Sequence, residues 1–148
     1  MKELWHFICC LALYIHQLPQ NLAGFFLSRS WLNRQYFTTY NGDVVLVYFT
    51  RNVFGAGIPL GDYIILDNEN YYATNCMTAV SHEHGHQYQS LYLGWLYLPV
   101  VGLVSFVRCA FDRLILKRFL SSEKRYKWYY SGYPESWADK LGQVPDRW

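Results

Sequence analysis

Charged residues are scarce in this chain. Asp, Glu, Lys and Arg make up 16% of its 148 residues, whereas 52% are hydrophobic and 20% are aromatic. This composition excludes a disordered chain, because disordered segments are rich in charge and poor in aromatic side chains. The formal net charge of +2 is too small to indicate nucleic acid as a partner. We therefore expect an unusually apolar globular protein or one that contacts a membrane.

Cysteine pairs and a cleavable leader are also lacking. No CxxC pair or regular framework exists, which argues against a cysteine zinc site or a disulfide scaffold and favours buried, reduced thiols. The cysteines are Cys9, Cys10, Cys76 and Cys109. The apolar N-terminal run contains Glu3 and His6 and has no small-x-small cleavage site, so we expect a retained helix. The expected location is cytoplasmic or peripheral to a membrane.

The length of the chain suits one domain spanning residues 1–148, with one hydrophobic core. Residues 1–30 are predicted to be an apolar helical region that packs on the core or lies at a membrane. DVVLVYFT and DYIILDN, from residue 43 and residue 62, are rich in β-branched and aromatic residues, which predicts strands. The intervening RNVFGAGIPLG predicts a loop or bent strand. These elements indicate an α+β fold with a small sheet and additional apolar helices.

A helix predicted over residues 76–91 has polar residues where a leucine stripe is usual. Thr74 or Asn75 can cap its first turn. The residues expected on its buried face follow helical spacing and are Ala79, His82, Glu83, His86 and Ser90. Polar groups at these positions indicate a function rather than simple packing.

His82, Glu83 and His86 form the pattern HExxH. Residues four apart lie on one face of a helix, so both imidazoles can bind one ion. Catalytic zinc usually has three protein ligands and one open position. No histidine follows His86, so the third ligand must be a downstream carboxylate. The candidates are Asp112, Glu123, Glu135, Asp139 and Asp146.

Glu135 is the best placed of these acids. The sequence YPESWADKLG predicts a short helix over residues 134–141, with Pro134 in its first turn and Gly142 beyond its end. Glu135 opens this helix, and Asp139 lies four residues later on the same face.

HExxH followed by Glu135-x-x-x-Asp139 resembles the gluzincin type of zincin metallopeptidase. The sequence at residues 80–144, with HEHGHQYQSLYLGWLYLPVVGLVS and YPESWADKLGQV, also resembles small uncharacterised bacterial proteins that carry HEYGH, LG-LYL and a terminal ExWADxLGGV. One difference is Pro134, because the best-known gluzincins have asparagine there.

The resemblance implies a zincin-like α+β fold and zinc-dependent peptide hydrolysis. His82, His86 and Glu135 would bind Zn²⁺. Glu83 would take a proton from the water that zinc activates and deliver it to the leaving amine. Asp139 would lie outside the ligand set and accept a hydrogen bond from a ligand histidine. The expected oxyanion donors are tyrosines close to Glu135 in the sequence: Tyr129, Tyr130 and Tyr133.

The implied partner is a peptide or protein substrate. Residues 62–68 could form a sheet edge to which an extended peptide adds as a strand, or could be an ordinary interior strand. Gly85 can let substrate or another backbone approach the helix closely. His84 projects away from the other two histidines, so we expect it at the surface or in packing.

Residues 91–107 carry no charge, which also fits a membrane span. A full span would separate His86 from Glu135 by about 30 Å, so the metal site and the span exclude each other. We expect instead a buried or re-entrant hairpin broken at Gly94, Pro99 and Gly102. Seven basic residues in 108–127 could hold the protein against anionic lipid or form a solvated face.

Two other readings of the chain remain open. One is a non-catalytic membrane-associated or interaction module that retains the metal site. The other is a structural membrane protein without a metal.

Overall fold

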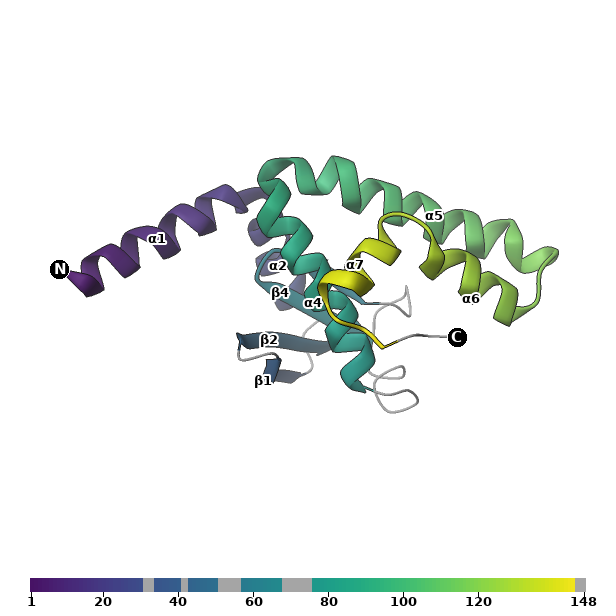
Figure 1. The fold of residues 1–148 in the computed structure, drawn as a ribbon, viewed down its shortest axis with the longest axis horizontal. Helices are drawn as coiled ribbons and strands as arrows, with labels where there is room; N and C mark the ends of the chain where they lie inside the picture. Colours follow the sequence, from purple (N-terminus) through teal and green to yellow (C-terminus); the bar gives the residue numbers. More distant parts are fainter. Residues whose placement is uncertain (31–33, 41–42, 51–56, 68–75, 146–148) are drawn as a thin grey trace.

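The computed structural model describes residues 1–30, 34–40, 43–50, 57–67 and 76–145. It shows an α+β fold in which a small sheet lies against one side of a group of helices (Figure 1). The predicted α+β class is confirmed at this level. Thr74, Asn75 and Asp146 lie outside the described residues.

Two helices begin the chain, as predicted for residues 1–30: α1 (Lys2–His16) and α2 (Leu18–Ser30). Pro19 lies in the first turn of α2, where its missing N–H removes no helical hydrogen bond. α2 packs against the sheet, and its Asn21 accepts a hydrogen bond from the backbone N–H of Asp62 at 2.8 Å. No residue of α1 is buried.

The described residues form a sheet of four strands in the order β1-β2-β4-β3. In chain order they are β1 (Arg34–Tyr40), β2 (Asp43–Thr50), β3 (Ile58–Leu60) and β4 (Tyr63–Asp67). β4 pairs in parallel with β2, while β1 and β3 pair antiparallel with their neighbours. Ile64 and Ile65 of β4 are almost completely buried, as suits a strand with partners on both sides. Of the two alternatives for residues 62–68, the interior strand is therefore the one that holds for β4, and β3 is the edge strand beside it.

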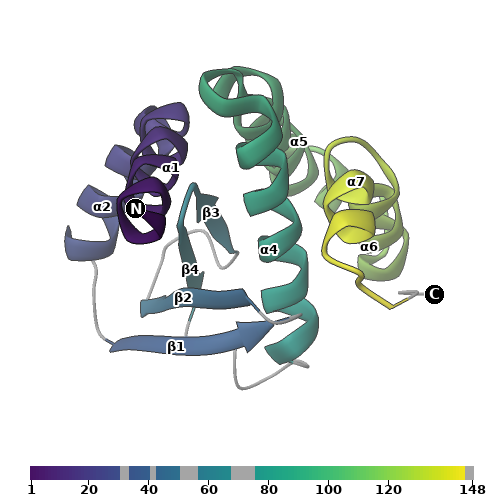
Figure 2. The same cartoon turned by 60° about the vertical axis from the view of Figure 1, so that its left-hand side comes forward.

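Helix α4 (Cys76–Leu93) carries HExxH and contacts β3. Figure 2 shows it between α1 and α2 on one side and the C-terminal helices on the other. Its C-terminal end is fixed by a buried polar cluster, in which Gln20 donates hydrogen bonds to Ser90 Oγ and Gly94 O at 2.9 Å each. Ser90 donates in turn to Gln17 at 2.6 Å. Ser90 is thus buried as predicted, but against α2.

The chain turns sharply after α4. The helical stretches on the two sides of Tyr97 differ in direction by 118°. Gly94, at the turn, has a φ of +53°, and His16 fills the space that a side chain there would need. The predicted break at Gly94 is confirmed. Pro99 and Gly102 instead lie in continuous helix: η1 (Gly94–Leu96), the π-helical η2 (Leu98–Gly102) and α5 (Leu103–Leu114).

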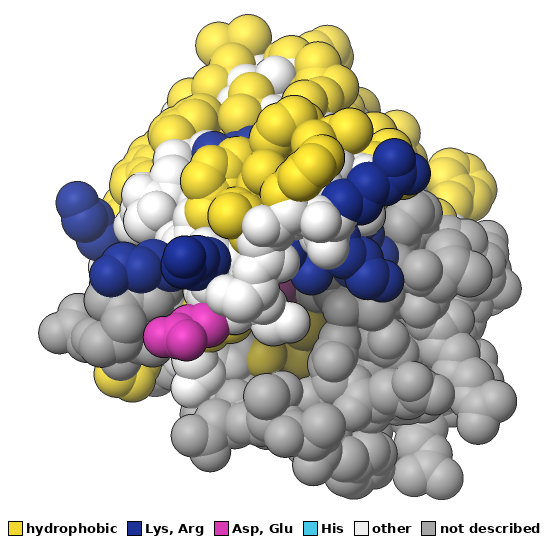
Figure 3. All heavy atoms as spheres, turned by 90° about the vertical axis from the view of Figure 1, so that its right-hand side faces the viewer, with side chains coloured by type: hydrophobic (Ala, Val, Ile, Leu, Met, Phe, Trp, Pro, Cys, Tyr) yellow, Lys and Arg dark blue, Asp and Glu magenta, His cyan; other side chains and the backbone are white. Residues whose placement is uncertain are grey.

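Much of the uncharged run is exposed, so the buried form of the expected hairpin is wrong, while the re-entrant form stays a prediction. Leu96, Leu103 and Phe106 are each more than half exposed, and Figure 3 shows hydrophobic side chains gathered on this part of the surface. Among the described helices, none alone has the length and hydropathy of a membrane span; one bent pair, Thr78–Leu96 with Leu98–Arg118, passes on length and composition. Cys9 and Cys10 are also exposed, and Cys109 is half-buried, so burial of these thiols was wrongly predicted.

The chain returns to α4 through three further elements: η3 (Leu116–Arg118), α6 (Ser122–Ser131) and α7 (Glu135–Leu141). α7 crosses α4 at a very short distance. A Cβ at Gly85 would overlap the carbonyl oxygen of Ala138, and a Cβ at Gly142 would overlap that of Ser81. The backbones therefore touch at two glycines, which confirms that Gly85 allows another backbone to approach.

We expect Gly85→Ala to destabilise the fold by about 1–3 kcal/mol, since the new methyl group must push α7 away from α4. Gly102→Ala is the matched control, because its Cβ would have no neighbour closer than 3.6 Å. Urea denaturation should show a lower midpoint for Gly85→Ala and an unchanged or higher one for Gly102→Ala. Equal midpoints would contradict the close helix contact.

Candidate metal centre

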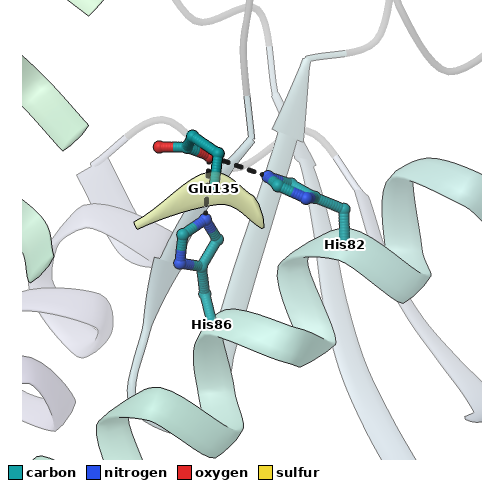
Figure 4. Close-up of side chains that lie close together, drawn as sticks. All are labelled: His82, His86 and Glu135. Carbon is teal, nitrogen blue, oxygen red and sulfur yellow. Dashed lines mark hydrogen bonds and ion pairs between the residues drawn. The ribbon is translucent and has the colours of Figure 1, made fainter. Parts of the chain in front are cut away.

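Three side chains from two helices converge in the interior. His82 and His86 of α4 point their Nε2 atoms toward one carboxylate oxygen of Glu135 on α7 (Figure 4). Oε2 of Glu135 lies 3.0 Å from His82 Nε2 and 3.2 Å from His86 Nε2. All three residues are buried, and Glu135 is only 1% exposed.

This geometry fits a metal ion. One ligand atom from each residue lies within 4.8 Å of the others. Donors that bind a tetrahedral ion at about 2.0–2.1 Å stand about 3.3 Å apart, close to the two separations measured to Glu135. Within the described part of the chain the group consists of two imidazoles and one carboxylate, which leaves a fourth tetrahedral position without a protein ligand. The cluster of His82, His86 and Glu135 can therefore hold a metal ion, as predicted.

The other ring nitrogen of each histidine is also fixed. His82 Nδ1 donates to Asp139 Oδ1 at 2.6 Å, the contact predicted for Asp139. His86 Nδ1 donates to Gln89 Oε1 at 2.7 Å, and the Gln89 amide donates to the carbonyl of Pro134 at 3.0 Å. These partners can only accept at those oxygens, so they keep hydrogen on Nδ1 and turn Nε2 toward Glu135.

Glu135 is held from its other side by α5. Ser105 donates to Glu135 Oε1 at 2.6 Å, and the Tyr129 hydroxyl lies 3.2 Å from Ser105 Oγ. Because the serine hydrogen is used on Glu135, the tyrosine is the donor to the serine. Oε1 is thereby occupied, and Oε2 is left for the ion. Sequence reasoning missed Ser105 and Gln89. The sequence features that could have pointed to them are the position of Ser105 as a lone serine in an apolar run and the position of Gln89 three residues after His86.

Charge within the cluster is strongly coupled. Burial opposes ionisation of Glu135, but its contacts with His82 and His86 outweigh burial and hold the pKa of Glu135 well below its ordinary value. Burial likewise disfavours a charged His82, yet Asp139 and Glu135 raise the pKa of His82 to about 9. Without a metal, His82 is therefore protonated at neutral pH and donates from both ring nitrogens.

Glu83 is buried beside the cluster. Its carboxylate packs so closely against the backbone before β3 that a Cβ at Gly57 would overlap it. Tyr97 lies nearby and donates its hydroxyl to the carbonyl of Pro59 at 3.2 Å. Burial, with the charges of Glu83 and Glu135, raises the pKa of Tyr97 well above its ordinary value, so its hydroxyl stays protonated. The edge strand β3 thus borders the acid of HExxH.

The three predicted oxyanion donors have different surroundings. Tyr130 packs edge-on against His82, with ring centroids 5.2 Å apart. Tyr129 belongs to the serine–glutamate contact, and burial with the nearby charge of Glu135 raises its pKa. Tyr133 donates its hydroxyl to the carbonyl of Val100 at 3.2 Å, so that hydrogen is used outside the cluster. The expectation for Tyr133 is not supported.

Other predicted residues lie apart from the cluster. Asp112 pairs with Arg125 at 2.6 Å, and Glu123 is exposed in the first turn of α6. His84 is buried rather than at the surface: its Nδ1 lies 2.8 Å from Gln87 Oε1, and its ring packs on Tyr88. The packing interpretation of His84 is the one that holds.

Comparisons of this chain with protein-family models, with curated proteins and with solved structures give no match. The case for a metal centre therefore depends on the geometry of the described residues.

Replacing Asp139 by Asn should weaken metal binding by about 10–100-fold, because His82 would lose the charged acceptor that orients its ring. Lys140→Gln, at the exposed neighbouring position, is the matched control and should bind as the unchanged chain does. Competition with a chromophoric chelator measures both affinities. Equal affinities for Asp139→Asn and the unchanged chain would contradict the role given to Asp139.

Metal binding should release about one proton at about pH 7.5, because the ion must displace the hydrogen on His82 Nε2. The folded-state pKa of His82, about 9, exceeds its ordinary 6.5. The pairing of protonated His82 with Asp139 and Glu135 therefore contributes its full stabilisation to the metal-free chain below pH 6.5. This stabilisation is lost as the pH rises through about 9. Apparent metal affinity should rise over the same window. Calorimetry in buffers of different ionisation enthalpy counts the protons, and no release would contradict the assignment.

Proposed function

We propose that this protein is a zinc-dependent metallopeptidase with a zincin-like site. The observation that carries the proposal is the return of Glu135, 49 residues beyond His86, to within hydrogen-bonding distance of both imidazoles. A chance HExxH on a solvated helix would need no buried carboxylate opposite it. The contact between Asp139 and His82 adds a fourth residue in the expected place.

Zinc is the metal that this ligand set suits best. Two neutral imidazoles and one carboxylate are a common protein ligand set of catalytic zinc, while calcium and magnesium prefer oxygen ligands alone. When bound, zinc would supply a Lewis acid that polarises a peptide carbonyl and lowers the pKa of water to about 7.

Residues of this chain supply the proton transfer and the hydrogen bond to the oxyanion. Glu83 follows His82 directly and is a buried carboxylate at the cluster, so it serves as the general base that takes a proton and later gives it to the leaving amine. Tyr130 is the oxyanion donor we favour, because its ring packs on His82.

Glu83→Gln separates catalysis from metal binding. The variant should keep about one zinc per chain, because Glu83 is not a ligand, and should lose about 10²–10⁴-fold in hydrolysis of a fluorogenic peptide library. Glu123→Gln, an exposed acid on α6, is the control and should retain activity.

A zinc-loaded chain that hydrolyses no peptide, or a Glu83→Gln variant as active as the unchanged chain, would contradict the proposal. The first result would favour a non-catalytic module that retains the metal site.

A further inference from the structure

Helix α5 is amphipathic, with its apolar side facing outward. Along it, hydrophobic residues recur every three or four positions and are between 45% and 65% exposed. They are Leu103, Phe106, Val107, Phe111 and Leu114.

The opposite side of α5 is polar and faces the protein. Ser105 donates to Glu135, and Arg108 donates to the carbonyl oxygens of Trp128 and Tyr129 at 2.7 and 3.0 Å. Asp112, further along, pairs with Arg125 of α6. A helix on the surface of a soluble protein has the reverse arrangement, with its apolar stripe toward the core. The outward stripe of α5 therefore lacks the protein cover that such a stripe normally has.

Helix α1 extends this surface. None of its residues is buried, and Figure 1 shows α1 and α5 running along the same side of the molecule, opposite the sheet. Trp95, at the turn after α4, donates its indole N–H to the carbonyl of Ile15 at 2.9 Å and so links the end of α1 to that turn. We call the outward stripe of α5, Trp95, Leu96 and the exposed apolar residues of α1 the apolar face. Those of α1 that share one side of the helix are Leu4, Phe7, Ile8, Leu11 and Ile15.

Basic side chains border the apolar face. Figure 3, which views the molecule from the end of α5, shows Lys and Arg side chains in a band beside the hydrophobic surface. The exposed basic residues from the end of α5 to α6 are Arg113, Lys117, Arg118, Lys124 and Lys127. Glu123 is the exposed acid in the same stretch. An apolar surface with this border matches the acyl chains and negative headgroups of an anionic bilayer.

We propose that the apolar face binds an anionic lipid bilayer, with α1 and α5 lying in the plane of its interface. Among the described helices, neither α1 nor the stretch that contains α5 has by itself the length and hydropathy of a membrane span, so we place both in the interface rather than across the bilayer. Trp5 and Trp95 have the amphipathic rings that favour the interface. A second copy of the chain is a poorer partner, because a symmetric contact would bring the two basic borders together. Because Ser105 contacts Glu135, the metal cluster lies directly behind the lipid-facing helix.

Vesicle co-sedimentation of the full zinc-loaded chain tests this proposal independently of peptidase activity. We expect binding to phosphatidylcholine vesicles that contain about 30% phosphatidylserine to exceed binding to pure phosphatidylcholine by about tenfold or more, and to weaken with added salt. Tryptophan emission should shift to shorter wavelength on binding. No binding to the anionic vesicles, or equal binding to both kinds, would overturn the proposal.

Two variants and one control locate the surface. Lys117→Glu should weaken binding to the anionic vesicles by about tenfold, whereas Lys140→Glu, the same charge change on α7, should not. Phe106→Ser combined with Phe111→Ser should abolish binding while zinc content, which reports the fold, stays unchanged. If the serine variant does not fold, the lysine pair still decides, and equal effects of the two lysine changes would sink the proposal. A stable dimer that the serine changes convert to monomer without lipid would also overturn it.

Discussion

The backbone contact between α4 and α7 is the constraint on which the metal cluster depends. Gly85 and Gly142 let the two helices touch, and only at that separation does the first residue of α7 reach both imidazoles. Any side chain at either glycine would meet a backbone carbonyl rather than a flexible group, so the helices cannot adjust by changing rotamers. α7 can therefore lie this close to α4 only because both contact residues are glycines. That position brings Glu135, the third ligand, to the two histidines.

Burying three ionisable groups together is unfavourable unless each is paired, and the surrounding residues supply the partners. Asp139 and Gln89 hold the outer ring nitrogens, while Ser105 holds the outer oxygen of Glu135. The atoms left facing inward are the two Nε2 nitrogens and Oε2 of Glu135. In the metal-free chain a proton on His82 Nε2 pairs with this oxygen, and a bound ion can take the place of that proton. α5 connects this cluster to the outside, because its polar side supports Glu135 while its apolar side is exposed.

Local patterns in the sequence predicted the parts of the site that lie within one helix. Spacing placed both histidines on one face of α4, and the start of a short helix pointed to Glu135. Contacts between elements distant in the sequence are harder to predict from local patterns. The contact of Ser105 with Glu135 appears in the sequence only as one hydroxyl in an apolar run. The interior position of β4 depends on its pairing with β2 and β3, which no local pattern shows. β1 was missed although its tyrosines and threonines favour strands. The exposure of α5 also escaped prediction, because periodicity shows that a helix is two-sided but not which side faces inward.

The most direct test of the central claim, that two histidines of α4 and the glutamate of α7 hold one ion, is X-ray absorption at the zinc edge of the stoichiometrically loaded protein. The structure predicts nitrogen and oxygen neighbours at about 2.0–2.2 Å with the outer-shell scattering of two imidazoles. A sulfur neighbour at about 2.3 Å, or a spectrum without imidazole scattering, would contradict it.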